Sequence, residues 1–232
     1  MRILVTRPYP HCARTAARLR DMGHEVIEAP ALDIVRRAPD EIDLGGVDAL
    51  AITSSQAIGA LVGHRQLPEL ARLAVYTVGA RTAAAARELG FTSVLSADGD
   101  AKDLSRLIEA CHGSGDILYF GARDRSGDLE KHLAAAGIGC RLIEVYQADP
   151  VASWPHEVNE ALVKGEIDIL LAYSTRSAEV CANLLRGLAP AMLPRMVALS
   201  AKAGAPLTAL GPVEWAETPD EEALFLRALN RC

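Results

Sequence analysis

Residues 49–55 read Ala-Leu-Ala-Ile-Thr-Ser-Ser, a short apolar run that ends in hydroxylated residues. A similar stretch lies in the second half of the chain, where residues 169–176 read Ile-Leu-Leu-Ala-Tyr-Ser-Thr-Arg. Strands that are buried on both faces of a parallel sheet have this apolar character, and the loop that follows such a strand leads into a helix. We therefore predict a strand, a polar loop and a helix at both places.

The spacing of the following residues indicates that these stretches belong to a repeated sequence. Ser54 precedes Gly79 by 25 residues, and Thr175 precedes Ser200 by the same number. A glycine then follows both Gly79 and Ser200 at a distance of 11 residues. The chain reads as two copies of an α/β unit, which predicts two lobes with a cleft between them.

Apolar runs alternate with Ala-, Leu- and Arg-rich segments of helical period, as in helices packed on a parallel sheet. Two stretches, 32–39 and 146–155, break this rhythm at equivalent places in the two copies, and we expect them to run side by side as a hinge. The predicted strands are 3–6, 26–29, 49–52, 75–78, 93–95, 117–120, 141–146, 169–173, 196–199 and 213–216.

Composition excludes several classes of protein. The net charge of −6 and the aromatic content of 4% argue against nonspecific nucleic-acid binding, which needs positive charge. The five cysteines contain no Cys-x-x-Cys pair, so the sequence suggests neither a zinc site nor a disulfide framework. The chain reaches Arg7 and Pro8 after a short apolar run, which is too short for a signal peptide or a membrane span. We expect a cytoplasmic protein with reduced thiols.

The predicted loops after the strands collect small, hydroxylated and cationic residues. In a parallel sheet these loops open at the carboxyl edge, and the free N–H groups at the helix starts favour anions. This pattern predicts a cleft for a ligand with many carboxylates or phosphates. The candidate ligand-binding residues are Arg7, Thr53, Ser54, Ser55, Gly79, Thr82, Arg123, Arg125, Ser174, Thr175, Arg176, Ser177, Ser200 and Lys202.

Several of these residues also have a simpler structural explanation. A Ser or Thr before a helix most often caps that helix. Arg123 and Arg125 are interleaved with Asp124 and Asp128, which fits a set of surface ion pairs equally well. Tyr146 follows an apolar strand at the expected hinge, so its phenol either faces the cleft or packs at the strand end. The repetition of loops at equivalent positions favours ligand binding.

Other catalytic and cofactor signatures are missing from the sequence. It contains no G-x-G-x-x-G after the first strand, no G-x-x-x-x-G-K-[ST] and no G-x-S-x-G, and its six histidines show no metal-ligand spacing. The sequence therefore predicts no metal and no organic cofactor.

At this point the residues resemble the uroporphyrinogen-III synthase family, and the resemblance runs from end to end. Each motif is short, and the order and spacing of the motifs together make the match specific. The matching stretches are Val5-Thr6-Arg7-Pro8, Ile52-Thr53-Ser54-Ser55-Gln56-Ala57, Val78-Gly79-Ala80-Arg81-Thr82-Ala83, Val145-Tyr146-Gln147, residues 173–178 and Ala216-Glu217-Thr218-Pro219.

The resemblance implies two flavodoxin-like lobes, each a parallel sheet flanked by helices, joined by a two-stranded β-ribbon hinge. One lobe would take residues 1–31 and 151–232, and the other would take 38–144. Residues 32–37 and 145–150 would form the hinge, and each lobe would contain segments of both sequence copies.

The resemblance also implies the substrate, hydroxymethylbilane, a linear tetrapyrrole with eight carboxylates. The family removes the terminal hydroxyl from ring A, lets ring D attack through its substituted carbon to give a spiro intermediate, and recloses the ring with ring D inverted. Tyr146 matches the tyrosine placed to assist departure of the hydroxyl as a general acid or hydrogen-bond donor. A monomer is expected, with transient contact to the preceding pathway enzyme left open.

The second half departs from the family pattern. Ser200, Ala201 and Lys202 stand where the family usually has Gly-x-x-Thr, and Arg176 stands where a proline is common. Lys202 and Arg176 would then contact carboxylates directly. One alternative is a non-catalytic two-lobed binding protein for a polyanionic small molecule or tetrapyrrole. A receiver-like signalling domain needs an acidic pocket after the first strand, where this chain has Arg7.

Overall fold

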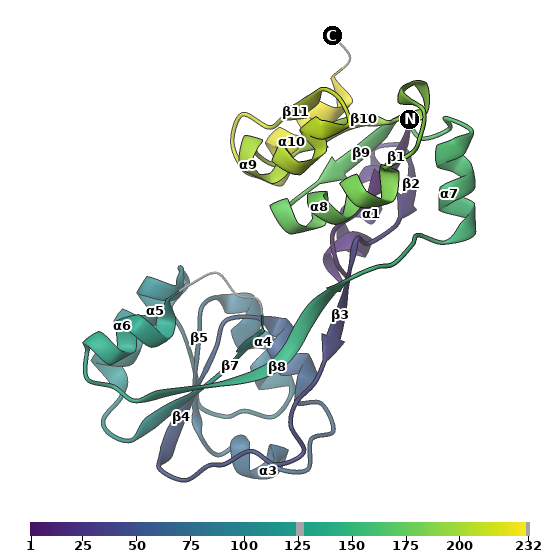
Figure 1. The fold of residues 1–232 in the computed structure, drawn as a ribbon. Helices are drawn as coiled ribbons and strands as arrows, with labels where there is room; N and C mark the ends of the chain where they lie inside the picture. Colours follow the sequence, from purple (N-terminus) through teal and green to yellow (C-terminus); the bar gives the residue numbers. More distant parts are fainter. Residues whose placement is uncertain (124–127, 231–232) are drawn as a thin grey trace. The chain divides into compact units, whose positions relative to one another are not determined.

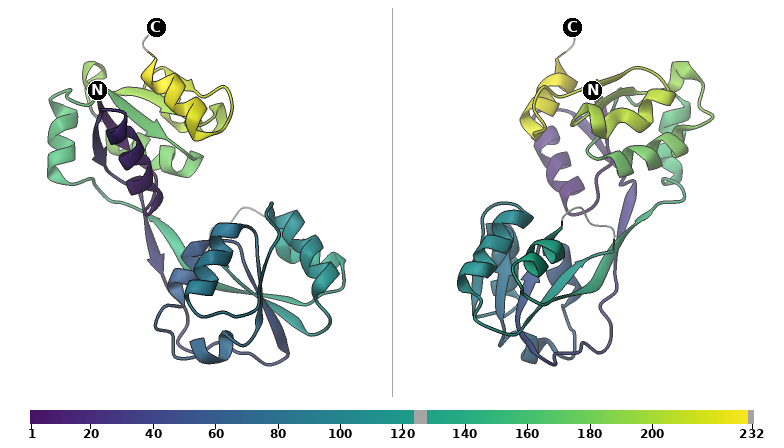
Figure 2. Two further views of the ribbon diagram at one scale, coloured as in Figure 1. Left: turned by 180° about the vertical axis from the view of Figure 1, so that it is seen from behind. Right: turned by 60° about the vertical axis from the view of Figure 1, so that its left-hand side comes forward.

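The computed structural model describes residues 1–123 and 128–230 (Figure 1). The chain divides into two compact units, which we call the terminal unit (Met1–Asp33 with Asp149–Cys232) and the central unit (Ile34–Ala148). The first and last segments of the chain lie in the same unit (Figure 2). Each unit is built on its own sheet.

The terminal unit has a sheet of parallel strands in the order β11-β10-β9-β1-β2. The strands are β1 (Arg2–Val5), β2 (Glu25–Glu28), β9 (Ile169–Ala172), β10 (Arg195–Ala198) and β11 (Val213–Trp215). The helices are α1 (His11–Asp21), α7 (His156–Val163), α8 (Thr175–Leu185), α9 (Ala201–Gly204) and α10 (Glu221–Leu229), with 3-10 turns at Pro190–Met192 and Ala205–Ala209.

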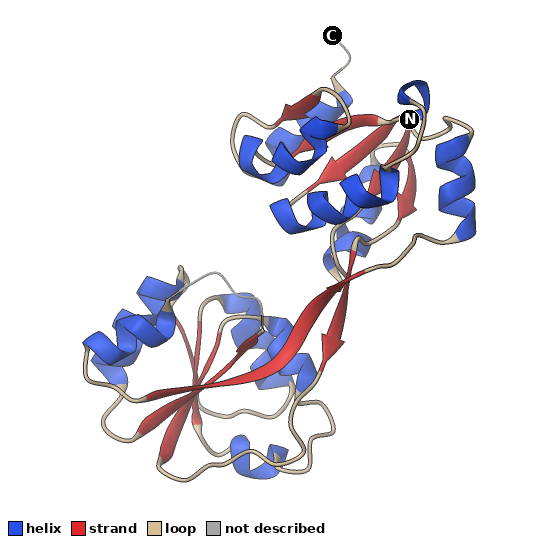
Figure 3. Cartoon of the chain, viewed as in Figure 1, coloured by secondary structure: helices blue, strands red, loops and turns tan. Residues whose placement is uncertain are grey.

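Alternation along β1 explains how both faces of this sheet are covered. Ile3 and Val5 pack with Leu19 of α1 and Phe225 of α10 in one apolar cluster. Leu4 lies between them and is also fully buried, and successive side chains of a strand point to opposite faces. Helices on both faces therefore bury the sheet (Figure 3), which is why its strands read as continuous apolar runs.

The central unit has a sheet in the order β3-β8-β7-β4-β5-β6, of which β8 to β6 are parallel. The strands are β3 (Leu32–Arg36), β4 (Val47–Ile52), β5 (Ala74–Thr77), β6 (Val94–Ser96), β7 (Asp116–Ala122) and β8 (Cys140–Pro150). The helices are α2 (Ser55–Ala60), α3 (Leu67–Leu70), α4 (Ala80–Glu88), α5 (Ala101–Cys111) and α6 (Leu129–Ala135).

Two apolar clusters cover the two faces of the central sheet. Leu50 and Phe120 pack with Ile58 of α2, whereas the alternate positions Ala51 and Tyr119 pack on the α5 and α6 side. Each of the ten predicted strands has its counterpart in the structure. The α/β fold class with parallel sheets flanked by helices is thus confirmed.

The first of the two stretches predicted to break the rhythm, 32–39, contains the strand β3, and the second, 146–155, begins with the end of β8. The Arg37 N–H donates to the Val145 carbonyl at 2.8 Å, and the Val151 N–H donates to the Ala31 carbonyl at 3.1 Å. Residue numbers rise along one segment as they fall along the other, so β3 and β8 run antiparallel. The chain passes between the units near Ile34 and again near Asp149. That this ribbon acts as a hinge stays a prediction.

Among the residues that the structure describes, no helix is both long and apolar enough to cross a membrane.

Candidate functional site

The carboxyl edges of the two sheets are built on one plan. The order β11-β10-β9-β1-β2 in the terminal unit corresponds to β6-β5-β4-β7-β8 in the central unit. Leu4 lies opposite Leu170, and Leu118 lies opposite Leu50, so β1 and β7 hold the same position. The loops after equivalent strands therefore open at equivalent points of each edge.

The loop after β4 ends in a capped helix. The Ser54 hydroxyl accepts a hydrogen bond from the Gln56 N–H at 3.2 Å, which makes Ser54 the N-cap of α2. The Thr53 hydroxyl lies 3.0 Å from the Tyr119 hydroxyl, and Ser55 is the first residue of the helix. The three predicted residues of this loop thus lie together at the edge.

Gly79 begins α4 without a side-chain cap. Its φ of −158° is extended backbone that any residue adopts, and a Cβ added there would meet nothing within 4 Å. Gly79 has no side chain that could accept a hydrogen bond from an N–H group at the start of α4, whereas a serine at this position could cap the helix in that way.

Tyr146 lies at a β-bulge in β8. Gly121 is opposite Glu144 and Ala122 is opposite Tyr146, so one extra residue sits on β8. The Tyr146 ring packs partly buried against the apolar cluster on the α2 side. Its hydroxyl makes no hydrogen bond with any described residue and is not a buried unpaired atom. The phenol is therefore free to bond a ligand.

The end of β7 lies beside this tyrosine. The Arg123 N–H donates to the Tyr146 carbonyl at 2.9 Å, and the Arg123 side chain is exposed. The strand order then places the Thr53 loop on the other side of β7. Tyr146 within β8, Arg123 after β7 and the Thr53 loop after β4 thus belong to three neighbouring strands. Arg125 lies outside the described residues.

The edge of the terminal unit has two capped helices joined by a hydrogen bond. Ser174 caps α8 by accepting from the Ser177 N–H, and Ser200 caps α9 by accepting from the Ala203 N–H. The Thr175 hydroxyl donates to the Lys202 carbonyl at 3.1 Å, which ties the two loops together. The Lys202 side chain is exposed, and Arg176 is partly exposed.

These caps correct the alignment of the two copies by one residue. The sequence spacing matched Ser54 with Thr175, but the N-cap equivalent to Ser54 is Ser174. Gly79 and Ser200 remain equivalent, since both are N-caps. The error arose because the two copies were aligned by the number of residues between motifs, which does not show which residue caps each helix.

Two predicted contact residues are buried. The Thr82 and Ser177 residues are 6% and 1% exposed. Their N–H groups are also bonded, Thr82 to the Gly79 carbonyl and Ser177 to the Ser174 hydroxyl. In this structure both residues support their loops and do not line the edge.

The terminal edge contains an ionic network that the sequence did not reveal. The Arg7 Nη1 donates to Thr15 Oγ1 at 3.1 Å and to Glu221 Oε1 at 2.8 Å, and its guanidinium lies 4.2 Å from the centre of the Tyr173 ring. Arg18 binds the other oxygen of Glu221. Arg7 is therefore already paired with an acid, a partner that sequence reasoning missed.

The network shifts the ionisation of its members. Burial alone would raise the pKa of Glu221, but hydrogen bonds from Thr15 and Arg18 outweigh it and hold that pKa below its ordinary value. Burial, with the negative charge of Glu221 nearby, raises the pKa of the Tyr173 phenol. Glu221 is therefore an anion, and Tyr173 is a neutral phenol, at neutral pH.

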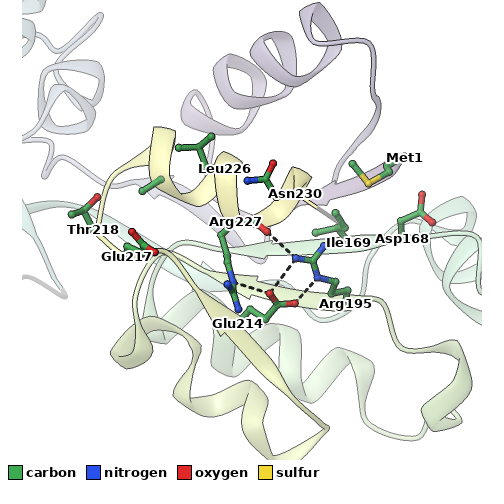
Figure 4. Close-up of a pocket in the computed structure, with 11 residues that line it drawn as sticks. Met1, Asp168, Ile169, Arg195, Glu214, Glu217, Thr218, Leu226, Arg227 and Asn230 are labelled. Carbon is green, nitrogen blue, oxygen red and sulfur yellow. Dashed lines mark hydrogen bonds and ion pairs between the residues drawn. The ribbon is translucent and has the colours of Figure 1, made fainter. Parts of the chain in front are cut away.

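A cavity of about 740 Å³ lies elsewhere in the terminal unit (Figure 4). It includes Ile169 and Arg195, the first residues of β9 and β10, and none of the predicted site residues. Three of its charged side chains pair with one another, since Glu214 binds both Arg195 and Arg227. The hydrogen bonds from Arg195 are the main cause of the lowered pKa of Glu214.

Within residues 1–123 and 128–230, no group of three or more His, Cys, Asp or Glu side chains is arranged to hold a metal ion.

Comparison with solved structures supports the fold. The uroporphyrinogen-III synthetase of Helicobacter pylori 26695 matches with a TM-score of 0.68 and 19% identity, over 99% of each chain. A mutant uroporphyrinogen III synthase of the extremely thermophilic bacterium Thermus thermophilus matches with a TM-score of 0.53 and 19% identity, over 99% of this chain and 98% of that one. No curated protein matches the sequence.

The family described as "Uroporphyrinogen-III synthase HemD" matches residues 13–225, which is nearly the whole chain. The match includes both units and the ribbon strands that join them. The chain therefore belongs to the uroporphyrinogen-III synthase family, as its motifs had indicated.

Proposed function

We propose that this protein is a cyclising hydro-lyase that converts hydroxymethylbilane into uroporphyrinogen III in tetrapyrrole synthesis. The observation that carries the proposal is the family match over residues 13–225. The free hydroxyl of Tyr146 at the carboxyl edge supports it further. Monomeric state and cytoplasmic location remain predictions.

Tyr146 is the proposed general acid. The C–O bond of the hydroxymethyl group breaks as the hydroxyl takes a proton from the phenol and leaves as water, and the ring A N–H proton passes through solvent to the phenolate as the neutral azafulvene forms. A tyrosine hydroxyl with no protein partner can approach the leaving oxygen without first breaking another hydrogen bond. The neighbouring Arg123 contributes positive charge for the carboxylates of the rings at this point.

Carbon–carbon bond formation then depends on conformation. The substituted carbon of ring D bonds to the azafulvene methylene and gives the spiro intermediate. The bond from that carbon to the methylene attached to ring C then breaks, and the other α-carbon of ring D bonds to the freed methylene and loses its proton to solvent. The uncatalysed bilane closes without inversion, so the protein has to hold ring D in the less accessible arrangement. Proximity and orientation therefore supply most of the selectivity.

We propose that the loops hold the substrate carboxylates largely through backbone N–H groups. The Thr53 to Ser55 loop and the uncapped start of α4 serve this role in the central unit. The Ser174, Thr175 and Ser200 loops, with the cations of Arg176 and Lys202, serve it in the terminal unit. Anions at helix starts are stabilised by these N–H groups and by the helix dipole.

The isomer ratio of the product tests the proposal. Freshly generated hydroxymethylbilane is incubated with the protein, with heat-denatured protein and with buffer, and type I and type III uroporphyrinogen are separated by chromatography after oxidation. We expect type III to predominate only with the native protein. A ratio equal to that of the buffer control would reject the enzymatic proposal and leave the non-catalytic binding protein.

A further inference from the structure

Arg7 is held in one orientation by contacts on two sides. Its guanidinium carbon lies 4.2 Å from the centre of the Tyr173 ring, which is stacking distance for a cation on an aromatic face. Its Nη1 donates to Thr15 Oγ1 and Glu221 Oε1 at 3.1 and 2.8 Å. The side chain is only 19% exposed. These contacts fix both the plane of the guanidinium and its rotation within that plane.

Glu221 is itself held in place by contacts with residues other than Arg7. Its Oε1 also accepts from the Thr15 hydroxyl at 2.5 Å and from the Tyr173 hydroxyl at 3.4 Å, and its Oε2 is paired with Arg18. Glu221 belongs to α10, Thr15 and Arg18 belong to α1, and Tyr173 follows β9. Three separate elements of one unit therefore converge on Arg7.

One side of the Arg7 guanidinium is left without a partner. Both Nη1 hydrogens have acceptors, whereas Nε and Nη2 make no hydrogen bond with any described residue. Neither nitrogen is buried without a partner. The Nε–H and one Nη2–H of a guanidinium are parallel, and this pair matches the two oxygens of a carboxylate.

We propose that Thr15, Tyr173 and Glu221 are positioning residues that hold Arg7 as a preformed receptor for one carboxylate of the substrate. This inference rests on the proposed function, because that function supplies a polycarboxylate ligand. A guanidinium already fixed in place loses little conformational freedom when the ligand binds. In the central unit, the positions equivalent to Tyr173 and Glu221 hold Thr53, which follows β4, and Ala101, which begins α5, so neither an aromatic ring nor a carboxylate stands there.

Binding of uroporphyrin III tests the receptor apart from catalysis. This stable octacarboxylate is titrated by absorbance into the wild-type protein and into Arg7→Lys, Arg7→Ala, Tyr173→Leu, Tyr173→Phe and Glu221→Gln variants. Arg20→Ala is the matched control, because Arg20 is also an arginine of the terminal unit, in α1, and pairs with Glu28 instead. Far-UV circular dichroism checks the fold of each variant.

We expect Arg7→Lys and Arg7→Ala to weaken binding about tenfold, since lysine cannot form the bidentate pair. Tyr173→Leu and Glu221→Gln should weaken it about threefold through a less ordered Arg7, whereas Tyr173→Phe keeps the ring and should restore near wild-type affinity. In turnover, KM should rise by similar factors with kcat little changed, as for lost ground-state binding. The Arg20→Ala protein should match the wild type.

The outcomes separate the two proposals. If the wild-type protein yields type III uroporphyrinogen but does not bind uroporphyrin III, the receptor is rejected while the proposed function stands. If the wild type binds and a folded Arg7→Lys protein binds equally well, the receptor is rejected while the proposed function stands. If Tyr173→Leu and Glu221→Gln lower stability but leave affinity unchanged, the positioning role is rejected.

Discussion

In the terminal unit, the residue that follows β9 is Tyr173, and it carries the guanidinium of Arg7 on its ring. In the central unit, the equivalent residue after β4 is Thr53, and it shares a hydrogen bond with the hydroxyl of Tyr119. The strands and the N-caps Ser54 and Ser174 beside these positions are alike, but Tyr173 belongs to an ion network whereas Thr53 pairs with a neutral hydroxyl. Duplication thus preserved the backbone loops while the side chains diverged.

Tyr146 adds a second difference between the edges. It stands at the bulge of β8 with a free hydroxyl, whereas Tyr173 bonds to a carboxylate and has a raised pKa. A phenol engaged by Glu221 and covered by Arg7 is poorly placed to give up a proton. We therefore propose that the chemical step takes place at the central edge and that the terminal edge has a binding role.

The largest expected effect comes from Tyr146→Phe. Loss of the proposed general acid should lower kcat about 100-fold, at the lower end of the range for such groups. The affinity for uroporphyrin III should stay within about twofold, because the ring and the backbone loops remain. Steady-state kinetics and absorbance titration measure the two quantities. Tyr76→Phe, at a buried tyrosine of β5, is the control, and equal rates for the two variants would remove Tyr146 from the mechanism.

The next effect concerns the stability of the ion network. Glu221→Ala leaves Arg7 and Arg18 without their shared acid and should lower the unfolding free energy by about 2 kcal/mol. Trp154 and Trp215 are the only tryptophans and both belong to the terminal unit, so urea unfolding followed by tryptophan fluorescence reports on that unit. A loss under about 0.5 kcal/mol, as expected for an exposed surface pair, would show that the network is not fixed.

The pH dependence of stability should follow from the same carboxylate. The pKa of Glu221 is lower in the folded protein than its ordinary value of 4.5, so below that pH the unfolded chain binds more protons and stability falls. Glu221→Gln removes this contribution. The variant should therefore lose less stability than the wild type between pH 6 and about pH 3.5.

The control for this comparison is Glu179→Gln, at an exposed position of α8. It should retain the wild-type pH dependence of tryptophan-monitored unfolding. Parallel curves for the wild type and the Glu221→Gln protein would show that Glu221 is not held by the network in solution.

The smallest effects come from exchanging the caps of the two edges. Gly79→Ser should stabilise the central unit, and Ser200→Gly should destabilise the terminal unit, each by a few tenths of a kcal/mol. The Gly79 site has room for the added side chain and an extended backbone. Thermal unfolding followed by circular dichroism measures both changes. A large loss in either variant would show that the two loops are not built alike.

The fold was largely predictable because it depends on local patterns. Apolar runs such as Ala-Leu-Ala-Ile at 49–52 mark buried parallel strands directly, and the spacing to Gly79 identifies the next loop. β3 did not stand out as a strand in the apolar pattern, because its pairing with β8 joins residues far apart in sequence, and only the family resemblance implied a two-stranded ribbon there. The loops of the candidate site were predictable, because residue type and helix start coincide there.

The parts of the site that were missed depend on tertiary contacts. Arg7 and Glu221 are separated by 214 positions, and no local pattern brings them together. Thr82 and Ser177 were predicted as contacts because they follow the loops, but both face the interior from the first turn of a helix. Whether a residue of the first turn faces the interior or the edge depends on its position around the helix axis, and that position is known only when the first residue of the helix is known.

The central claim, that the protein inverts ring D, is tested most directly by the carbon–carbon bond that forms. Hydroxymethylbilane is labelled with ¹³C at the hydroxymethyl carbon and at the substituted α-carbon of ring D, and the product is examined by ¹³C NMR. Inversion joins the two labelled carbons, so we predict a one-bond coupling between them with the native protein. Uncoupled singlets, as in the protein-free reaction, would contradict the account.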